Sequence, residues 1–152
     1  MIRIGFFLMG LMLVSAYALA QTPRLKQGVC GKVLWKAGNQ MPSPDNKNIL
    51  AKGSPVVREI YIYELTTEKQ TISSEEAGFY KAVQTKLVKK VTTDKKGKFS
   101  VRLPDGYYSL FIKEEKGLYA NQFDDAMNIN PIQISKGKWV KADFIIDYAA
   151  VY

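Results

Sequence analysis

The feature that most constrains this chain is a short-range alternation of apolar and polar residues, which recurs from residue 21 onward. No window of a dozen residues there has the 3.6-residue apolar period of a helix. The clearest alternation covers residues 98–103 and 107–113, and turns containing glycine precede both segments. Alternation of this kind indicates strands with one buried face. We therefore predict an all-β fold, in which 98–103 and 107–113 pair as an antiparallel hairpin.

Other segments of the chain also have strand character. Gly28–Trp35 is the first of them, and Val56–Leu65 is apolar on both faces, which predicts a central strand that is covered twice. A second hairpin is expected from Ile132 to Tyr148, with its closing strand paired to a sheet. About seven strands at this spacing predict a seven-stranded Greek-key β-sandwich.

Two longer polar segments interrupt the strands. Residues Lys36–Pro55 are rich in Gly, Pro, Asn and Lys, and we expect a long surface loop there. Residues Thr66–Ala82 are expected to form an insertion that folds back over the face of Val56–Leu65 that carries Tyr61 and Tyr63. A short helical turn at Ser73–Ala77 is expected within this insertion, because Ser and Glu favour a helix start.

The first twenty residues have the pattern of a signal peptide. A charged start, the apolar run from Ile4 and the small residues up to Ala20 predict cleavage after Ala20 and export to the periplasm, the cell surface or the medium. The alternative is an uncleaved anchor, because an apolar stretch from residue 4 to 20 is near the lower limit of a bilayer span. After cleavage we expect no stable membrane span, a short linker over 21–27, and one domain over 28–152.

The composition removes several kinds of catalytic chemistry. The chain has no histidine, which excludes Ser–His and Cys–His nucleophile pairs and His-ligated zinc within it. It has one cysteine, Cys30, which excludes an intramolecular disulfide and is expected to act as a small buried apolar residue. We therefore predict that the chain is not an enzyme.

One stretch of residues carries a resemblance to a known family. The stretch begins at Thr93-Asp94, has turn glycines at Gly97 and Gly106, and alternates apolar with other residues up to Ile112. A Gly-x-Val pair, Gly31 and Val33, lies in the first strand. It resembles the carboxypeptidase regulatory-like domain, a prealbumin (transthyretin-like) β-sandwich of exported bacterial proteins. The resemblance implies an accessory role and no peptidase activity, because the metallopeptidases that carry such domains hold zinc in a separate catalytic domain.

Outward-facing aromatic residues are the candidate binding residues. Such rings stack on sugar faces or anchor a protein partner. The alternative is that the insertions or neighbouring strands cover these rings. The candidates are Trp35, Tyr61, Tyr63 and Trp139, and Tyr107 and Phe111 share their expected orientation.

A segment rich in Asp and Asn is the one candidate metal site. Asp124, Asp125, Asn128 and Asn130 offer the hard oxygen ligands that Ca²⁺ prefers. Their spacing differs from that of a known calcium loop, and the favoured alternative is a solvated Asx-rich turn. No other cofactor is expected.

Charge and export together limit the partners. The net charge of +8 comes from lysines spread over turns and edge strands, where they discourage sheet-to-sheet pairing. Export argues against nucleic acid as a partner, so we expect an envelope protein or a glycan, bound by a monomer or weak dimer. The predicted function is a non-enzymatic binding or structural module of the bacterial cell envelope; the alternative is a carbohydrate-binding module that uses exposed aromatic residues.

Overall fold

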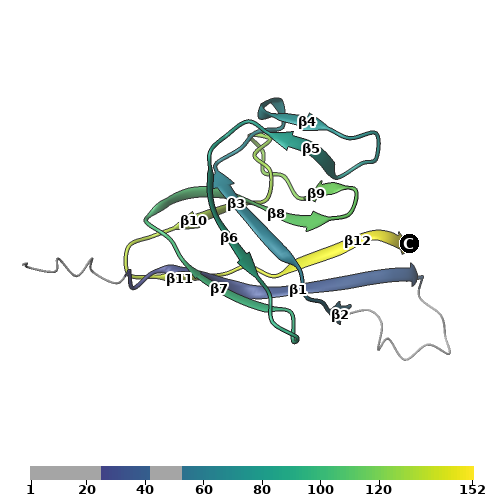
Figure 1. The fold of residues 1–152 in the computed structure, drawn as a ribbon, viewed down its shortest axis with the longest axis horizontal. Helices are drawn as coiled ribbons and strands as arrows, with labels where there is room; N and C mark the ends of the chain where they lie inside the picture. The colour runs from purple at the N-terminus through teal and green to yellow at the C-terminus, as the bar shows by residue number, and fades with distance from the viewer. Residues whose placement is uncertain (1–24, 42–52) are drawn as a thin grey trace, which may run out of the picture.

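Two β-sheets packed as a sandwich form the part of the chain that the computed structural model describes, residues 25–41 and 53–152 (Figure 1). The predicted signal peptide with its cleavage after Ala20, and residues 42–52 of the predicted loop, lie outside the described residues. No α-helix occurs within the described ranges, and no helix there is long and apolar enough to cross a membrane. The all-β prediction is confirmed, although these ranges contain twelve strand segments where seven were predicted.

The first sheet is built around one long strand. Strand β1 (Gly28–Asn39) pairs in parallel with β11 (Trp139–Lys141) and β12 (Phe144–Val151), and antiparallel with β2 (Ser54–Pro55) and β7 (Lys98–Arg102). The expected pairing of the terminal strand with a sheet is therefore confirmed. β1 extends four residues into the segment predicted as a loop, because its far half finds a partner in β12.

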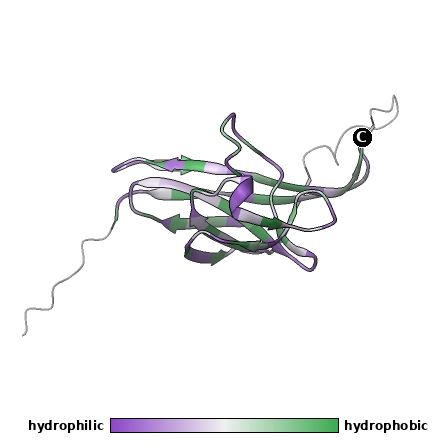
Figure 2. Ribbon diagram, turned by 90° about the horizontal axis from the view of Figure 1, so that it is seen from above, coloured by the Kyte–Doolittle hydropathy of each residue, from purple (hydrophilic) through white to green (hydrophobic). Residues whose placement is uncertain are grey.

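The second sheet lies against the first and has seven strands. Hydrophobic and hydrophilic residues alternate along the strands of both layers, as Figure 2 shows. In order, the second sheet contains β4 (Thr71–Ser73), β5 (Phe79–Val83), β9 (Gly117–Tyr119), β8 (Gly106–Glu114), β3 (Glu59–Glu64) and β6 (Leu87–Thr92), and β10 (Pro131–Ile134) pairs with β8.

The predicted hairpin over residues 98–113 is wrong. β7 pairs with β1 in the first sheet, whereas β8 pairs with β3 in the second, so the chain crosses from one sheet to the other between them. The Tyr108 hydroxyl fixes this crossing by donating a hydrogen bond to the Pro104 carbonyl at 3.1 Å. The turn before β7 forms as expected, because the Asp94 carboxylate accepts hydrogen bonds from the backbone N–H groups of Lys96 and Lys98.

The second predicted hairpin, from Ile132 to Tyr148, is wrong for the same reason. β10 belongs to the second sheet, and β11 and β12 both belong to the first. The turn between β10 and β11 closes through a hydrogen bond from the Lys138 N–H to the Ser135 carbonyl at 3.1 Å. Each of these tight turns therefore connects the two layers of the sandwich.

The space between the sheets is filled by the alternating apolar residues that the sequence identifies. Both predicted inner series, on residues 99–103 and 108–112, are buried there together with the inner residues of β1, β3 and β12. This first core contains Val29, Val33, Ile60, Ile62, Phe79, Phe99, Val101, Leu103, Tyr108, Leu110, Ile112, Tyr119, Ile134, Phe144 and Ile146.

A second, smaller core covers the outer face of the second sheet. It contains Tyr63, Tyr80, Phe111, Leu118, Ala120 and Ile129. The prediction that the strand carrying Tyr61 and Tyr63 is central and covered on both faces is confirmed, since β3 pairs with β6 and β8. Ile129, in the segment after β9, contributes to this cover. Residues 66–82 do not fold back over the face as predicted: they form β4 and β5, which extend the second sheet, and Tyr80 joins the second core from β5.

Two local expectations around β3 need correction. Its bounds are Glu59–Glu64, shorter than the predicted Val56–Leu65, because residues before Glu59 bond to Thr93 instead of continuing the ladder. The expected helical turn at Ser73–Ala77 does not form: Ser73 ends β4, and the chain turns at Glu76–Phe79, where the Phe79 N–H donates to the Glu76 carbonyl at 3.2 Å. A 3₁₀-helix (Glu68–Gln70) forms earlier. Gln70 favours that position, because its side-chain oxygen accepts a hydrogen bond from the Thr67 N–H at 3.0 Å.

Candidate functional site

The four aromatic residues predicted to bind a partner do not share one surface. Tyr63 is 9% exposed and belongs to the second core, so it cannot offer a ring face to a ligand. Tyr61 is half-buried, and the ammonium of Lys90 lies 4.3 Å from the centre of its ring. Trp35 and Trp139 lie on different parts of the first sheet: Trp139 pairs with the first residue of β1, and Trp35 is its eighth. Trp35 is half-buried and packs against the first core, because it follows Val29 and Val33 in the inward series of β1, which corrects its expected outward position.

The other two outward candidates also separate. Phe111 is fully buried in the second core, which corrects its expected exposure, whereas Tyr107 is 57% exposed. The covering residues come from distant segments, Tyr80 and Ile129, and this explains why an outward position on β8 became an interior one.

The Asp- and Asn-rich segment forms a closed turn. The Asp124 carboxylate accepts hydrogen bonds from the N–H groups of Ala126 and Asn128 and from the Asn128 side-chain amide, at 2.8–3.0 Å. The bond from the Asn128 side chain, followed by those from the backbone, holds the pKa of Asp124 below its usual value. Asp125 is exposed.

Asn130 is placed differently from the other three candidate calcium ligands. It is buried, accepts a hydrogen bond from the Gln122 N–H at 3.0 Å and donates one to the Leu110 carbonyl at 3.1 Å. A calcium ion would have to displace these bonds and the pairing of Asp124 with Asn128. Among the described residues, no group of three or more His, Cys, Asp or Glu side chains is arranged to hold a metal ion.

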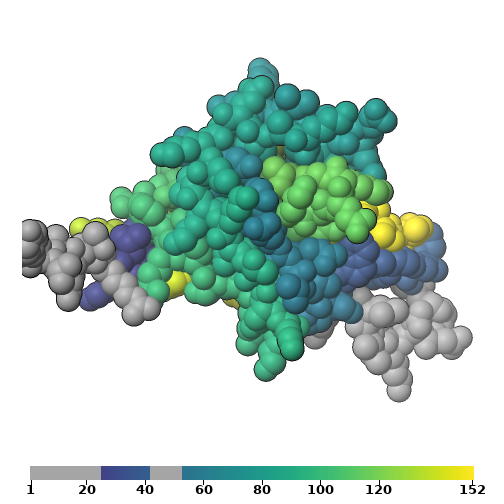
Figure 3. Space-filling model, viewed as in Figure 1, coloured from purple at the N-terminus to yellow at the C-terminus, as the bar shows by residue number. Residues whose placement is uncertain are grey.

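A cleft between the two sheets brings together residues from both. Its volume is about 600 Å³, and its lining combines aromatic rings with charged groups of both signs. In Figure 3 the end of β12 (yellow) emerges beside β9 (green) and the far part of β1 on this side of the molecule. The lining residues are Trp35 and Tyr148 from the first sheet, and Arg58, Lys113, Glu114 and Glu115 from the second sheet and its borders.

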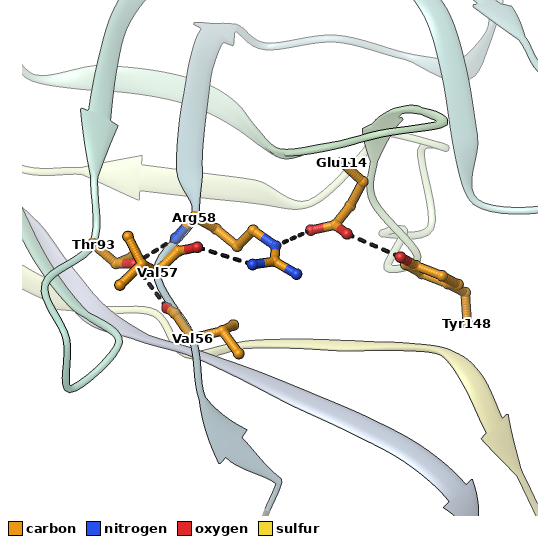
Figure 4. Close-up of polar contacts among 6 residues, drawn as sticks. All are labelled: Val56, Val57, Arg58, Thr93, Glu114 and Tyr148. Atoms are coloured by element: carbon orange, nitrogen blue, oxygen red, sulfur yellow. Dashed lines mark hydrogen bonds and ion pairs between the residues drawn. The ribbon is translucent and has the colours of Figure 1, made fainter.

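A buried carboxylate is the centre of this cleft. Glu114 is 6% exposed and accepts a hydrogen bond from Arg58 Nε at 2.5 Å and another from the Tyr148 hydroxyl at 2.9 Å (Figure 4). Arg58 also donates from Nη1 to the Val57 carbonyl at 3.0 Å. A buried charge is costly unless it is paired and hydrogen-bonded, and here each oxygen of Glu114 has a donor.

The backbone of Arg58 is held by a single threonine. Thr93 Oγ1 accepts a hydrogen bond from the Arg58 N–H and donates one to the Val56 carbonyl, both at 2.8 Å (Figure 4). The Thr93 N–H also donates to the Arg58 carbonyl at 2.9 Å. These three bonds fix the start of β3, so the Arg58 side chain reaches the cleft from a rigid base.

Tyr148 sits among other aromatic rings at the wall of the cleft. Its ring centre lies 5.0 Å from that of Trp35 in an edge-to-face arrangement, and 4.9 and 5.4 Å from those of Phe79 and Tyr119. Burial, followed by the hydrogen bond to Glu114 and the charge of that carboxylate, raises the pKa of Tyr148 to about 12. The phenol is therefore a hydrogen-bond donor over the whole physiological pH range.

The raised pKa of Tyr148 predicts a loss of stability at high pH. Between the ordinary tyrosine value of 10.0 and about 12, the folded protein keeps a proton that the unfolded chain releases. The free energy of unfolding must therefore fall as the pH rises through this window. Urea unfolding of the wild-type protein and Tyr148→Phe from about pH 9 upward measures this contribution.

We expect the difference in stability between wild type and Tyr148→Phe to shrink as the pH approaches 12. Tyr107→Phe, which removes an exposed phenol, serves as the matched control and should change the free energy of unfolding little. A pH-independent difference for Tyr148→Phe would contradict the assigned hydrogen bond to Glu114.

One sequence signal points to this site. The inward series Tyr108, Leu110 and Ile112 on β8 continues to Glu114, so a carboxylate occupies an inward position. A charge in such a series requires a partner. Nothing local identifies that partner as Arg58, because 56 residues separate the two in the chain.

Comparison with known proteins adds no identification. No protein-family model matches the chain, and neither a curated protein nor a solved structure matches it at a significant level.

Proposed function

We propose that this chain is a non-enzymatic, exported β-sandwich module with a binding or structural role in the bacterial cell envelope, and that it holds its partner in the cleft around Trp35 and Glu114. The two-sheet all-β arrangement supports the sandwich architecture of this proposal. The Greek-key prealbumin type and the resemblance to the carboxypeptidase regulatory-like domain, which comes from the sequence, are part of the same proposal. Export rests on the signal peptide predicted over residues 1–20, and N-terminal sequencing of the protein from cells should find Gln21 first.

The observation that carries the proposal is the hydrogen-bonded network inside the cleft. Both oxygens of Glu114 accept hydrogen bonds from side chains of this chain, and Tyr148 keeps its proton to about pH 12. A general acid or base has to exchange a proton with its substrate near the working pH, and these groups are not placed to do so. A cleft with rigid polar groups and a partly open aromatic wall fits binding better.

The carbohydrate-binding alternative has one specific observation in its favour. Trp35 and Tyr148 form an aromatic wall beside the guanidinium of Arg58 and the exposed side chains of Lys113 and Glu115. Sugar rings bind to such sites by stacking on an aromatic face and by hydrogen bonds from charged side chains. An envelope protein could use the same groups to anchor a loop.

Tryptophan fluorescence can report on binding in the cleft, because one of the two tryptophans lines the cleft and the other lies elsewhere. The chain contains only Trp35 and Trp139, so the fluorescence of a Trp139→Phe variant reports on Trp35 alone. This variant is titrated with fragments of envelope glycan, and a tagged mature protein is used in parallel to capture envelope proteins. Binding in the cleft should change the Trp35 emission for one of the two partner classes.

Lys113→Ala and Glu115→Ala change exposed side chains of the cleft and leave its buried network in place, whereas Trp35→Ala also removes the ring that packs against Tyr148. All three should weaken capture or titration several-fold, while Lys86→Ala, in the exposed connection between β5 and β6, should have no effect. Circular dichroism confirms that each variant is folded. If all three cleft variants bind the partner as tightly as the wild-type protein, the partner does not bind in the cleft. Hydrolysis of peptide or ester substrates by the pure protein would overturn the non-enzymatic proposal.

A further inference from the structure

The outer face of the first sheet carries a regular array of side chains. Inner residues of β1 and β7 fill the first core, so the residues between them point away from it. The register of β11, β1 and β7 arranges these outward residues in rows across three strands. The rows are Trp139, Gly28 and Arg102; then Lys141, Cys30 and Ser100; then Lys32 and Lys98. We call these eight residues the basic platform.

The first row is an aromatic site with a cation beside it. Gly28 has no side chain, and a Cβ added there would lie 2.1 Å from the Val101 carbonyl oxygen and 3.0 Å from Cζ3 of Trp139. The close approach of β7 therefore requires glycine at this position, and the indole lies beside it. The guanidinium carbon of Arg102 is 5.8 Å from the centre of the Trp139 ring. Trp139 is nevertheless 42% exposed, so part of the indole remains open to solvent.

The middle of the platform is shallow and its border is positive. Cys30 and Ser100 supply only small side chains and Gly28 supplies none. Cys30 is half-buried there and not in the core as predicted. Long cationic side chains surround them: Lys32, Lys98, Arg102 and Lys141, all exposed.

Two carboxylates border this surface. Asp143 accepts a hydrogen bond from the backbone N–H of Lys32 at 2.9 Å, and its other oxygen lies 3.5 Å from the Lys141 ammonium. Asp94 accepts a hydrogen bond from the backbone N–H of Lys98 at 2.9 Å, so the four cations of the platform are opposed by two carboxylates. Lys89 adds a further positive charge at the edge, where its ammonium lies 3.5 Å from the Arg102 carbonyl.

We propose that the basic platform binds an extended anionic glycan. A sugar ring would stack on the open part of Trp139, and the acidic groups of neighbouring sugars would pair with Arg102, Lys141, Lys32 and Lys98. Strands about 4.8 Å apart place these cations around a shallow floor, so a chain can lie flat between them. The surface is separate from the cleft, and binding there does not depend on the function proposed for the cleft.

Charge argues for this partner over a second copy of the chain. The protein carries a net charge of +8, so two platforms brought face to face would repel each other. A polyanion gains from the same field, which raises its local concentration near the surface. The aromatic ring adds a preference for sugars, because a simple polyphosphate has no ring to place on Trp139.

The test uses Trp35→Phe, in which Trp139 is the only tryptophan. The variant is titrated with alginate oligosaccharides, which are carboxylated, with neutral cellohexaose and with inorganic polyphosphate. We expect alginate to change the Trp139 emission and to bind at least about tenfold more weakly when salt reduces the Debye length from about 30 to 8 Å. We also expect cellohexaose to bind weakly at both salt concentrations and polyphosphate to bind without the emission change.

Two double variants with equal loss of charge separate the platform from the overall field. Arg102→Gln with Lys141→Gln removes two cations of the platform, whereas Lys81→Gln with Lys86→Gln removes two exposed cations on β5 and in the connection from β5 to β6. The first pair should weaken alginate binding about tenfold and the second about twofold or less. Trp139→Ala, followed by calorimetry, should weaken alginate binding and leave polyphosphate binding unchanged.

Several results would overturn the proposal. Equal losses in the two double variants would show that net charge alone attracts the glycan. Equal emission changes with alginate and polyphosphate would remove the role of the sugar ring. Alginate binding that leaves the Trp139 emission unchanged would place the glycan elsewhere on the protein.

Discussion

Unfolding of the Phe111→Ala variant is expected to require about 4 kcal/mol less free energy than unfolding of the wild-type protein. Phe111 is fully buried, and its ring meets those of Tyr63 and Tyr80 edge to face, each at 5.6 Å between centres. Removing the ring leaves a cavity in a core of only six buried residues, where few neighbours can move to fill it. Chemical denaturation followed by circular dichroism measures the loss.

The same strand provides a matched control for Phe111. Tyr107 lies four residues earlier on β8 and is 57% exposed, so Tyr107→Ala should change the free energy of unfolding by less than about 1 kcal/mol. If Phe111→Ala were as mild as its control, the outer face of the second sheet would not be covered as described. The aromatic residues there would then be open to ligands, as the sequence alone suggests.

The second large effect is expected at Glu114. Glu114→Ala removes the acceptor of Arg58 Nε and of the Tyr148 hydroxyl at once, and it leaves a partly buried guanidinium without its opposite charge. Breaking a buried ion pair by removing one partner costs several kcal/mol. Because Arg58 remains 33% exposed and recovers some solvation, we expect a loss of about 3 kcal/mol in the free energy of unfolding.

Glu115 is the control for this substitution, because it is the next residue in the chain and it is exposed. Glu115→Ala should change stability by less than about 0.5 kcal/mol. Glu114→Gln keeps the shape and loses the charge, so its loss should lie between the two. A Glu114→Ala protein as stable as Glu115→Ala would mean that Arg58 and Tyr148 do not depend on this carboxylate.

Sequence alternation predicts which residues of each strand enter the first core. The inward positions of residues 99–103 and 108–112 are all buried, as expected, because a strand with one dry face must turn that face toward the interior in either sheet. The coverage of β3 on both faces is also predictable, because an apolar residue at successive positions needs two covers.

Alternation does not determine which sheet a strand joins. A tight turn can connect two neighbours in one sheet or carry the chain across the core, and the inward residues are the same in both cases. The predicted hairpin between β7 and β8 fails for this reason. The sequence also lacks a local signal for the parallel pairing of β1 with β12, because over a hundred positions separate Val33 from its partner Phe144.

The candidate site depends on these long-range pairings. Trp35 meets Tyr148 because β1 and β12 are neighbours, and Glu114 meets Arg58 because β3 pairs with β8. Alternation along a single strand predicts an outward position for Tyr63. Segments that are distant in the sequence form the second core around this side chain and bury it. The basic platform likewise exists only because β7 and β11 flank the first half of β1.

The most direct test of this account is a measurement of which backbone segments are neighbours. Nuclear Overhauser contacts in isotope-labelled protein should connect Cys30 with Ser100 and Leu34 with Ile145, and should connect Tyr61 with Phe111. Contacts that instead pair residues 98–102 with 106–112 as a hairpin would contradict the crossing between the sheets. The cleft and the basic platform would then lose the arrangement on which both proposals rest.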